Sequence, residues 1–197
     1  MRNGTAGSQK STARYWPIYG SRSGIAYGSA LAATVFWGLS FVSMKAALVE
    51  ISPEGLVVTR FGIAAVFLAL LTLATGHRLS VRRAHWGGLL LLGFLGVFLH
   101  HLLQANALRY TSAGVAGWLV AIIPVFTAIL AAVILRELLS VTAVLGLLVA
   151  LGGTLLVVSR GHLGSLASGP GVVGDVLMVA SAANWAVYSV LLKRLAL

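Results

Sequence analysis

Six long apolar runs dominate the sequence and leave the chain few ways to fold. They cover residues 24–44, 56–75, 86–108, 113–135, 141–159 and 172–192. An α-helix rises 1.5 Å per residue, so about 20 residues cross a hydrocarbon core of about 30 Å. Only 9% of the residues are charged and the mean hydropathy is +0.97, which is far more apolar than a water-soluble domain. The sequence therefore predicts an all-α integral membrane protein, a polytopic helical bundle of about six transmembrane helices surrounded by a lipid bilayer.

The positions of the cations predict the direction of these spans. With a cytoplasmic N-terminus, the inner side holds ten cations: Arg2, Lys10, Arg14, Arg22, Arg78, Arg82, Arg83, Arg136, Lys193 and Arg194. The outer side then holds four: Lys45, Arg60, Arg109 and Arg160. Because Lys and Arg accumulate in cytoplasmic loops, we expect both termini in the cytoplasm, residues 1–23 as a disordered cytoplasmic leader, and an inner or plasma membrane location. The short cationic clusters favour this topological reading of the net charge of +10 over a nucleic-acid partner.

The end of the first span is echoed near the end of the chain. FWGLSFVSMKAALV (36–49) and WAVYSVLLKRLAL (185–197) each place a lysine eight residues after a tryptophan. At a single offset of 148 residues, Trp37, Val42 and Lys45 match Trp185, Val190 and Lys193. That offset contains five helices, so the second copy enters the membrane from the opposite side. Such an inverted repeat is a common architecture of secondary transporters.

Several segments, in order, carry a resemblance to a known family. They are WGLSFVSMKAAL (37–48), the stretch 53–61, ALRYTSAGVAGWLVAIIPVFTAILAAVIL (107–135), RELLSVTAVLGLLVALGGTLLV (136–157) and GDVLMVASAANWAVYSVLLKR (174–194). Over about residues 26–197 the chain resembles the EamA-type transporters of the drug/metabolite transporter superfamily. The resemblance implies ten helices in two inverted five-helix repeats that move small metabolites, often amino acids or drugs, outward. It implies a first repeat at residues 24–160 and the first helix of a second, truncated repeat at residues 172–197.

The chain departs from the family pattern in two ways. Ser40 and Phe41 follow Trp37-Gly38 where the family often has Asn-Phe, which implies an altered substrate preference. Only one helix of the second repeat is present, so the sequence is either a fragment of a ten-helix protein or a degenerate short form. A single repeat lacks the partner against which it would rock. We therefore expect a monomer of this chain to be inactive in transport without a missing second half or a homo-oligomeric partner.

Polar residues within the third span indicate an inward-facing stripe. At 100° per residue, Gly93, Gly96, His100 and Gln104 fall on one side of the helix, with His101 beside them. Glycines let another backbone approach, and polar groups in a membrane usually face the bundle interior or a wet cavity. His100 either exchanges protons, since imidazole titrates near neutrality, or packs as a neutral side chain.

The sixth span has a second polar and aromatic face. Ser181, Asn184, Trp185 and Tyr188 are spaced i, i+3, i+4 and i+7, so they share one side of a helix. In the first span, Trp37 and Ser40 occupy the positions equivalent to Trp185 and Tyr188. In an inverted repeat these faces meet near the pseudo-twofold axis, where substrates bind. The alternative for the tryptophans is an interfacial belt.

Three further residues interrupt apolar runs. Arg60 lies about five residues inside its span, where it either binds a substrate carboxylate or holds the preceding loop through Glu50 or Glu54. Lys45 ends the first span as an anchor that reaches water. Pro124 lies mid-span and predicts either a transport hinge or a passive kink. The predicted substrate-binding residues are Trp37, Ser40, Arg60, His100, Gln104, Asn184, Trp185 and Tyr188, with Pro124 as the hinge.

The absence of common catalytic and nucleotide-binding motifs favours transport over catalysis. No G-x-x-x-x-G-K-[ST], H-E-x-x-H or G-x-S-x-G motif is present, and none of the four carboxylates falls mid-span. We therefore predict no enzyme, catalytic residue, cofactor or metal site. The leading hypothesis is a secondary transporter that exports small amphipathic metabolites or amino acids by alternating access. The alternative is a non-transporting membrane subunit that binds a protein partner.

Overall fold

The computed structural model describes residues 23–76, 81–136, 138–159 and 171–195. Every regular element in these ranges is helical. The chain divides into two units, Met1–Trp37 and Gly38–Leu197, and each is described by itself. Apart from Ser23, the predicted leader lies outside the described residues, as do Arg160, most of the loop before the last span, and the final two residues.

Within the described residues, five helices are long and apolar enough to cross a membrane, and a sixth apolar helix is shorter. The elements are α1 Ser23–Ala47, α2 Pro53–Ala74, α3 Trp86–Gly93, α4 His100–Tyr110, α5 Ala113–Val120, α6 Ile123–Ile134, α7 Val141–Val158 and α8 Val172–Leu195, with the short turns η1 Arg83–His85 and η2 Phe94–Leu99. The segments η1 to α4 form one span of 28 residues, and α5 with α6 forms another of 22. The predicted all-α polytopic bundle is therefore confirmed, with α7 as the shorter apolar helix.

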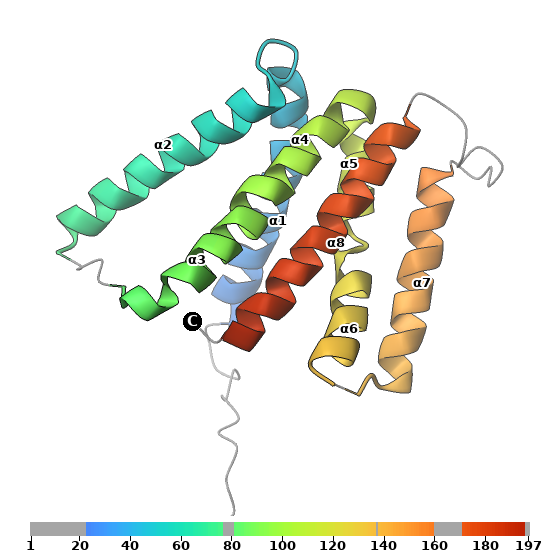
Figure 1. Ribbon diagram of the computed structural model, residues 1–197. Helices are drawn as coiled ribbons and strands as arrows, with labels where there is room; N and C mark the ends of the chain where they lie inside the picture. The colour runs from blue at the N-terminus through green and yellow to red at the C-terminus, as the bar shows by residue number, and fades with distance from the viewer. Residues whose placement is uncertain (1–22, 77–80, 137, 160–170, 196–197) are drawn as a thin grey trace, which may run out of the picture. The chain divides into compact units, whose positions relative to one another are not determined.

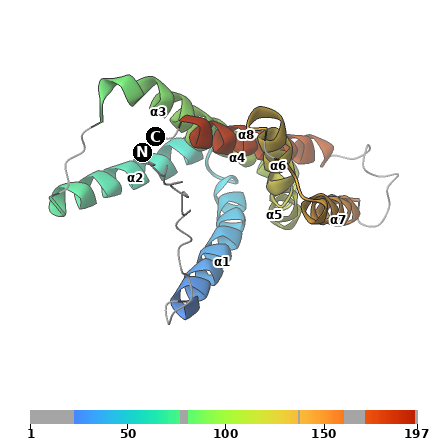
Figure 2. The same ribbon diagram turned by 90° about the horizontal axis from the view of Figure 1, so that it is seen from below.

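Helix α8 is the central helix of the second unit. It lies between the α3–η2–α4 span and the α5–α6 span, while α7 packs on the α5–α6 side (Figures 1 and 2). Its buried residues are mostly small: Gly174, Met178, Ser181, Ala182, Ala186 and Val190. Small side chains let neighbouring helices come close, which is how helices associate where lipid is as apolar as the core. The last span thus packs closely against both of its neighbours.

The buried apolar residues form two clusters around α8. The first joins the end of α1 to α4, α5 and α8 and consists of Phe41, Met44, Ala107, Leu108, Ala116, Leu119 and Met178. The second joins α6 to α8 and consists of Ile122, Val125 and Ala182. Most other large apolar side chains are exposed, for example on α2 and α7. An apolar surface of this extent suits lipid or another helix as its neighbour.

A polar junction joins the end of α1, the end of α4 and the start of α8. Lys45 Nζ donates to the carbonyls of Leu108 and Thr111, the latter at 3.0 Å. Thr111 Oγ1 donates to Asp175 Oδ1 at 2.8 Å. A cation suits the carbonyl-rich end of α4, and a carboxylate suits the N-terminal turn of α8. Lys45 therefore caps the C-terminal end of α4. This role is more specific than the predicted one, an anchor that reaches water.

This junction also sets the relative direction of two helices. Residues 38–47 of α1 end at the junction, whereas α8 begins there. Helix α4 likewise ends at the junction, so α4 and α8 are antiparallel. The last turns of α1 and the first turns of α8 therefore run in opposite senses.

Candidate functional site

The side chains of greatest chemical interest gather where α8 packs against η2 and α4. His100 is 2% exposed, and its Nδ1 lies 3.0 Å from the carbonyl oxygen of Ser181. Because a carbonyl only accepts, Nδ1 of His100 must donate, which in a neutral imidazole leaves Nε2 as the acceptor. Gln104, one turn further along α4, is also buried. The predicted inward stripe is thus the face that meets α8.

Five rings follow one another across three helices, and we call them the ring series. In order they are Phe61, His101, His100, Trp185 and Tyr188, with centroid separations of 4.6, 5.0, 4.6 and 5.0 Å. Phe61 comes from α2, the two histidines from α4, and the last two rings from α8. Tilted rings at such separations attract one another beyond their buried area. The ring series therefore ties both α2 and α8 to α4.

The backbone turn before His100 is unusual. Residues Phe94–Leu99 form a π-helix, in which the His100 N–H donates to the Leu95 carbonyl five residues earlier. Asn184 Nδ2 donates to the same carbonyl at 2.7 Å. π-Helices are rare, occur mostly as single turns inside α-helices, and are frequent at functional sites. Asn184 therefore connects α8 directly to the widened turn that presents His100.

The π turn corrects one detail of the predicted stripe. A regular helix would place Gly93 in line with Gly96 and His100, but Gly93 is half-buried with open space around it. Leu92 is buried instead, at 5% exposed. The wider turn takes up one extra residue, so every position before it shifts by one around the helix.

Gly96 lies directly beneath the last ring of the series. A Cβ built on Gly96 would come within 2.7 Å of the Tyr188 ring. Only glycine leaves room for that ring against the backbone of η2. Ser181, Asn184, Trp185 and Tyr188 thus all contact the η2–α4 segment, as their shared helical face predicts.

His101 and Arg60 lie at the α2 end of the ring series. The Nδ1 atom of His101 is buried and has no hydrogen-bond partner in the described part of the chain. Arg60 Nη1 donates to the sulfur of Met44 at 3.1 Å, and its Cζ lies 5.6 Å from the Phe61 ring. Within the described ranges, Arg60 forms no ion pair with Glu50 or Glu54. The predicted loop contact is therefore not what holds Arg60.

The remaining predicted residues are less informative. Trp37 belongs to the first unit and is 53% exposed, and Ser40 is half-buried in α1. Pro124 is the second residue of α6, directly after the break at Ala121 and Ile122. Proline has no N–H for the carbonyl four residues earlier, so the span is discontinuous where Pro124 predicts a kink. Whether this break acts as a hinge stays a prediction.

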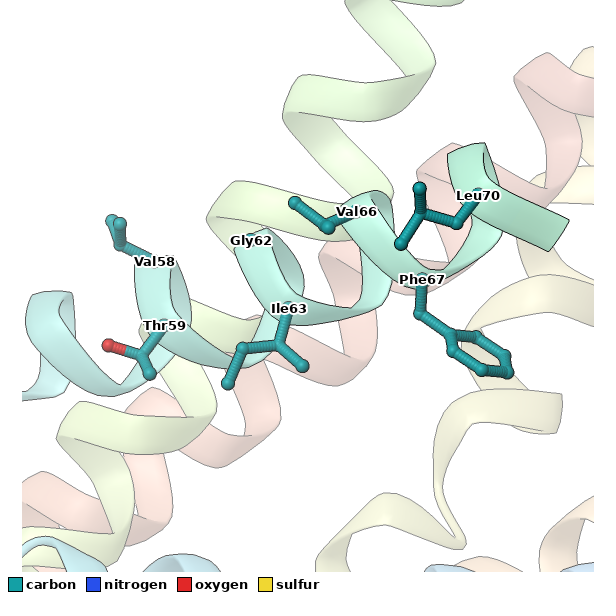
Figure 3. Close-up of a pocket in the computed structure, with 7 residues that line it drawn as sticks. All are labelled: Val58, Thr59, Gly62, Ile63, Val66, Phe67 and Leu70. Carbon is teal, nitrogen blue, oxygen red and sulfur yellow. The ribbon is translucent and has the colours of Figure 1, made fainter. Parts of the chain in front are cut away.

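A pocket of about 490 Å³ lies along α2, outside this site (Figure 3). Its lining residues all come from α2: Val58, Thr59, Gly62, Ile63, Val66, Phe67 and Leu70. All of them are exposed, and Val66 lies about 140° around the helix from Phe61, which faces His101. The pocket is therefore an open apolar face of α2. In the described ranges no three His, Asp or Glu side chains come together in an arrangement that could hold a metal ion.

Sequence reasoning missed the contacts of Phe61 and Met44 with this site. Both residues lie in ordinary apolar runs, and no pattern along the chain distinguishes them from lipid-facing neighbours. Their roles depend on which helices pack together. Phe61 meets His101 because α2 packs on α4, and Met44 meets Arg60 because the end of α1 joins the same core.

The fold and the site define a polytopic, all-helical membrane protein with polar and aromatic groups collected inside the bundle. Residues 24–159 match the model of the EamA-like transporter family, and the chain belongs to that family. It is 32% identical over 162 residues to the uncharacterized transporter YyaM of Bacillus subtilis, covering 82% of this chain and 53% of YyaM. It is 30% identical over 169 residues to an uncharacterized transporter of Archaeoglobus fulgidus, covering 84% of this chain and 56% of that protein.

Both of these relatives are named as transporters. The relatives are named transporters, which agrees with the prediction that the chain is not an enzyme. The chain spans about half the length of the curated relatives it matches. No solved structure matches the chain significantly.

Proposed function

We propose that the chain works in a secondary transporter that exports small amphipathic metabolites or amino acids by alternating access. The observation that carries this proposal is the ring series at the packed face of α8, together with the polar contacts of His100 and Asn184. Polar side chains deep in a membrane are costly and commonly mark a substrate path. Aromatic side chains with a few hydrogen-bonding groups are suited to binding an amphipathic substrate.

The transporter is proposed to contain two inverted five-helix repeats, with residues 24–160 as the first and α8 as the first helix of the second. The opposite senses of α1 and α8 at the shared junction support this arrangement. A second half or a second copy of the chain would complete the cavity. Trp37, Ser40 and Gln104 remain proposed lining residues, and the break before Pro124 is the proposed hinge.

The half-exposed rings of α8 are the proposed contact surface for substrate. Trp185 and Tyr188 are both half-buried, whereas His100 is enclosed. Enclosure and the bond to the Ser181 carbonyl support a packing role for His100. Substrate would then meet Trp185 and Tyr188 first, with His100 holding the Trp185 ring in position.

A vesicle experiment tests the transport proposal. The purified chain is reconstituted, its oligomeric state is measured, and counterflow of radiolabelled amino acids is followed. We expect flux in oligomers, no flux in monomers, and a large loss of flux in Trp185→Ala. Trp118→Ala is the matched control, because Trp118 lies on α5 and is 57% exposed. Flux from a verified monomer would contradict the two-repeat proposal, and equal flux in the two variants would contradict the assigned site.

A further inference from the structure

Arg60 is a cation within a membrane-spanning helix whose charge no described carboxylate balances. It lies seven residues after Pro53, about 10 Å along α2 from its first residue. A cation at mid-span costs about 2.5–3.5 kcal/mol on insertion scales. Residues of this kind are rare in spans and usually belong to a substrate or ion path. The cost of placing Arg60 here therefore calls for a partner.

The described partners of Arg60 are weak ones. A guanidinium has five N–H donors, and a thioether sulfur is a poor acceptor. One donor of Arg60 reaches the sulfur of Met44, and the guanidinium lies beside the Phe61 ring. Asp175, in contrast, already accepts a hydrogen bond from Thr111 at the junction with Lys45. The side chain of Arg60 is exposed in the described chain, so the remaining donors are accessible.

We propose that Arg60 binds the carboxylate of the transported substrate, with the Phe61 and His101 rings as the adjoining apolar wall. This inference rests on the proposed transport function and narrows it to small organic acids, amino acids included. Phe61 and His101 are each half-buried, so each ring keeps an open side. His101 also holds a buried Nδ1 without a partner. The Arg60 guanidinium and the His101 ring therefore both lie beside the Phe61 ring.

The charge at this position favours a carboxylate over a phosphate monoester. A single guanidinium matches the single charge and the planar, two-oxygen shape of a carboxylate. A phosphate monoester carries about −1.5 to −2 charges near pH 7 and would call for a second cation. Lys45, the other cation near Met44 in sequence, is committed to the carbonyls of Leu108 and Thr111.

Calorimetric titration of the full chain in phosphatidylcholine nanodiscs tests the inference with matched probes. Benzoate supplies a carboxylate on a ring, benzamide is its neutral counterpart, and phenyl phosphate supplies the alternative anion. We expect benzoate to bind at least about tenfold more tightly than benzamide, because a hydrogen bond to a charged group contributes on that scale. Arg60→Gln should remove this preference and Arg60→Lys should reduce it, since lysine keeps the charge without the planar fork.

Arg109→Gln is the control variant, because Arg109 is an exposed cation in the last turn of α4. Its benzoate affinity should equal that of the unmodified chain. The inference is overturned by equal binding of benzoate and benzamide, by no benzoate binding, or by unchanged benzoate binding in Arg60→Gln. Tighter binding of phenyl phosphate overturns the carboxylate assignment. If Arg60→Gln does not fold, the inference is still tested by the benzoate affinity of Arg60→Lys and by the affinities of the three probes for the unmodified chain.

Two further measurements distinguish a substrate carboxylate from a lipid headgroup, and the carboxylate site from the transport proposal. Adding phosphatidylglycerol to the nanodiscs should leave benzoate binding unchanged, and its abolition would assign Arg60 to a lipid headgroup instead. Counterflow measurements separate this inference from the transport proposal. Binding that depends on Arg60 in a chain without flux defeats only the transport proposal, whereas flux that is independent of Arg60 defeats only the carboxylate site.

Discussion

Gly93 and Gly96 look equivalent in the sequence, but their surroundings differ completely. The Cβ position of Gly96 is occupied by the Tyr188 ring, whereas that of Gly93 is open. Both glycines could be assigned to an inward stripe from periodicity alone. Only one of them is required for packing, because α8 brings Tyr188 against Gly96. These two residues are about ninety positions apart in the sequence. Periodicity along one helix cannot report such a contact.

Gly96→Ala should destabilise the packing of α8 on η2. The added methyl group would lie 2.7 Å from Tyr188 ring atoms, so the ring must leave its present position beside Trp185. Overpacking of this kind costs about 1–3 kcal/mol, and thermal unfolding in detergent would measure it. Gly93→Ala is the matched control and should be as stable as the unmodified chain or slightly more so, since alanine favours a helix. Equal stability of the two variants would contradict the close approach of Tyr188.

At the scale of an element, the π turn shows how a neighbouring helix shapes a backbone. Residues Phe94–Leu99 are apolar and suit an ordinary α-helix, so the sequence predicts an uninterrupted span there. The structure widens this turn, and Asn184 of α8 donates to the Leu95 carbonyl within it. The inward direction of Asn184 was predictable from its helical face, but its acceptor was not.

Asn184→Leu should weaken the contact between α8 and the π turn. Hydrogen bonds between membrane helices contribute about 0.6 kcal/mol on average and up to about 1.7 kcal/mol, so the free energy of unfolding should fall by that order. Asn106→Leu serves as the control, because Asn106 donates within its own helix, to the Leu102 carbonyl. Equilibrium unfolding in mixed micelles compares the two. A larger loss in Asn106→Leu would argue against Asn184 as the connecting residue.

At the scale of the whole molecule, the proposed inverted duplication depends on the relative direction of the end of α1 and the start of α8. Helix α1 ends, and α8 begins, at the junction of Lys45, Thr111 and Asp175. Two segments that resemble each other and run in opposite senses are what an inverted duplication requires. The inverted duplication stays a proposal, because three matched residues in apolar sequence carry little information.

Single-cysteine labelling tests this arrangement across the bilayer. The chain contains no cysteine, so each introduced thiol is the sole target. With a cytoplasmic N-terminus, Val49→Cys and Val173→Cys should react with an impermeant maleimide from outside the cell. Val81→Cys should react only after the membrane is opened. All three side chains are exposed. Reaction of Val49→Cys and Val173→Cys from opposite sides would contradict the shared junction.

The sequence by itself determined that this chain is an all-helical membrane protein and which faces of its third and sixth spans turn inward. Both conclusions depend on hydropathy and helical period, which are local properties of a chain that must satisfy its own backbone in lipid. The tertiary structure alone decided the ring series, the π turn and the partners of Lys45 and Arg60. Each of these depends on which helices touch, and contacts between distant residues are set by the packing of whole helices.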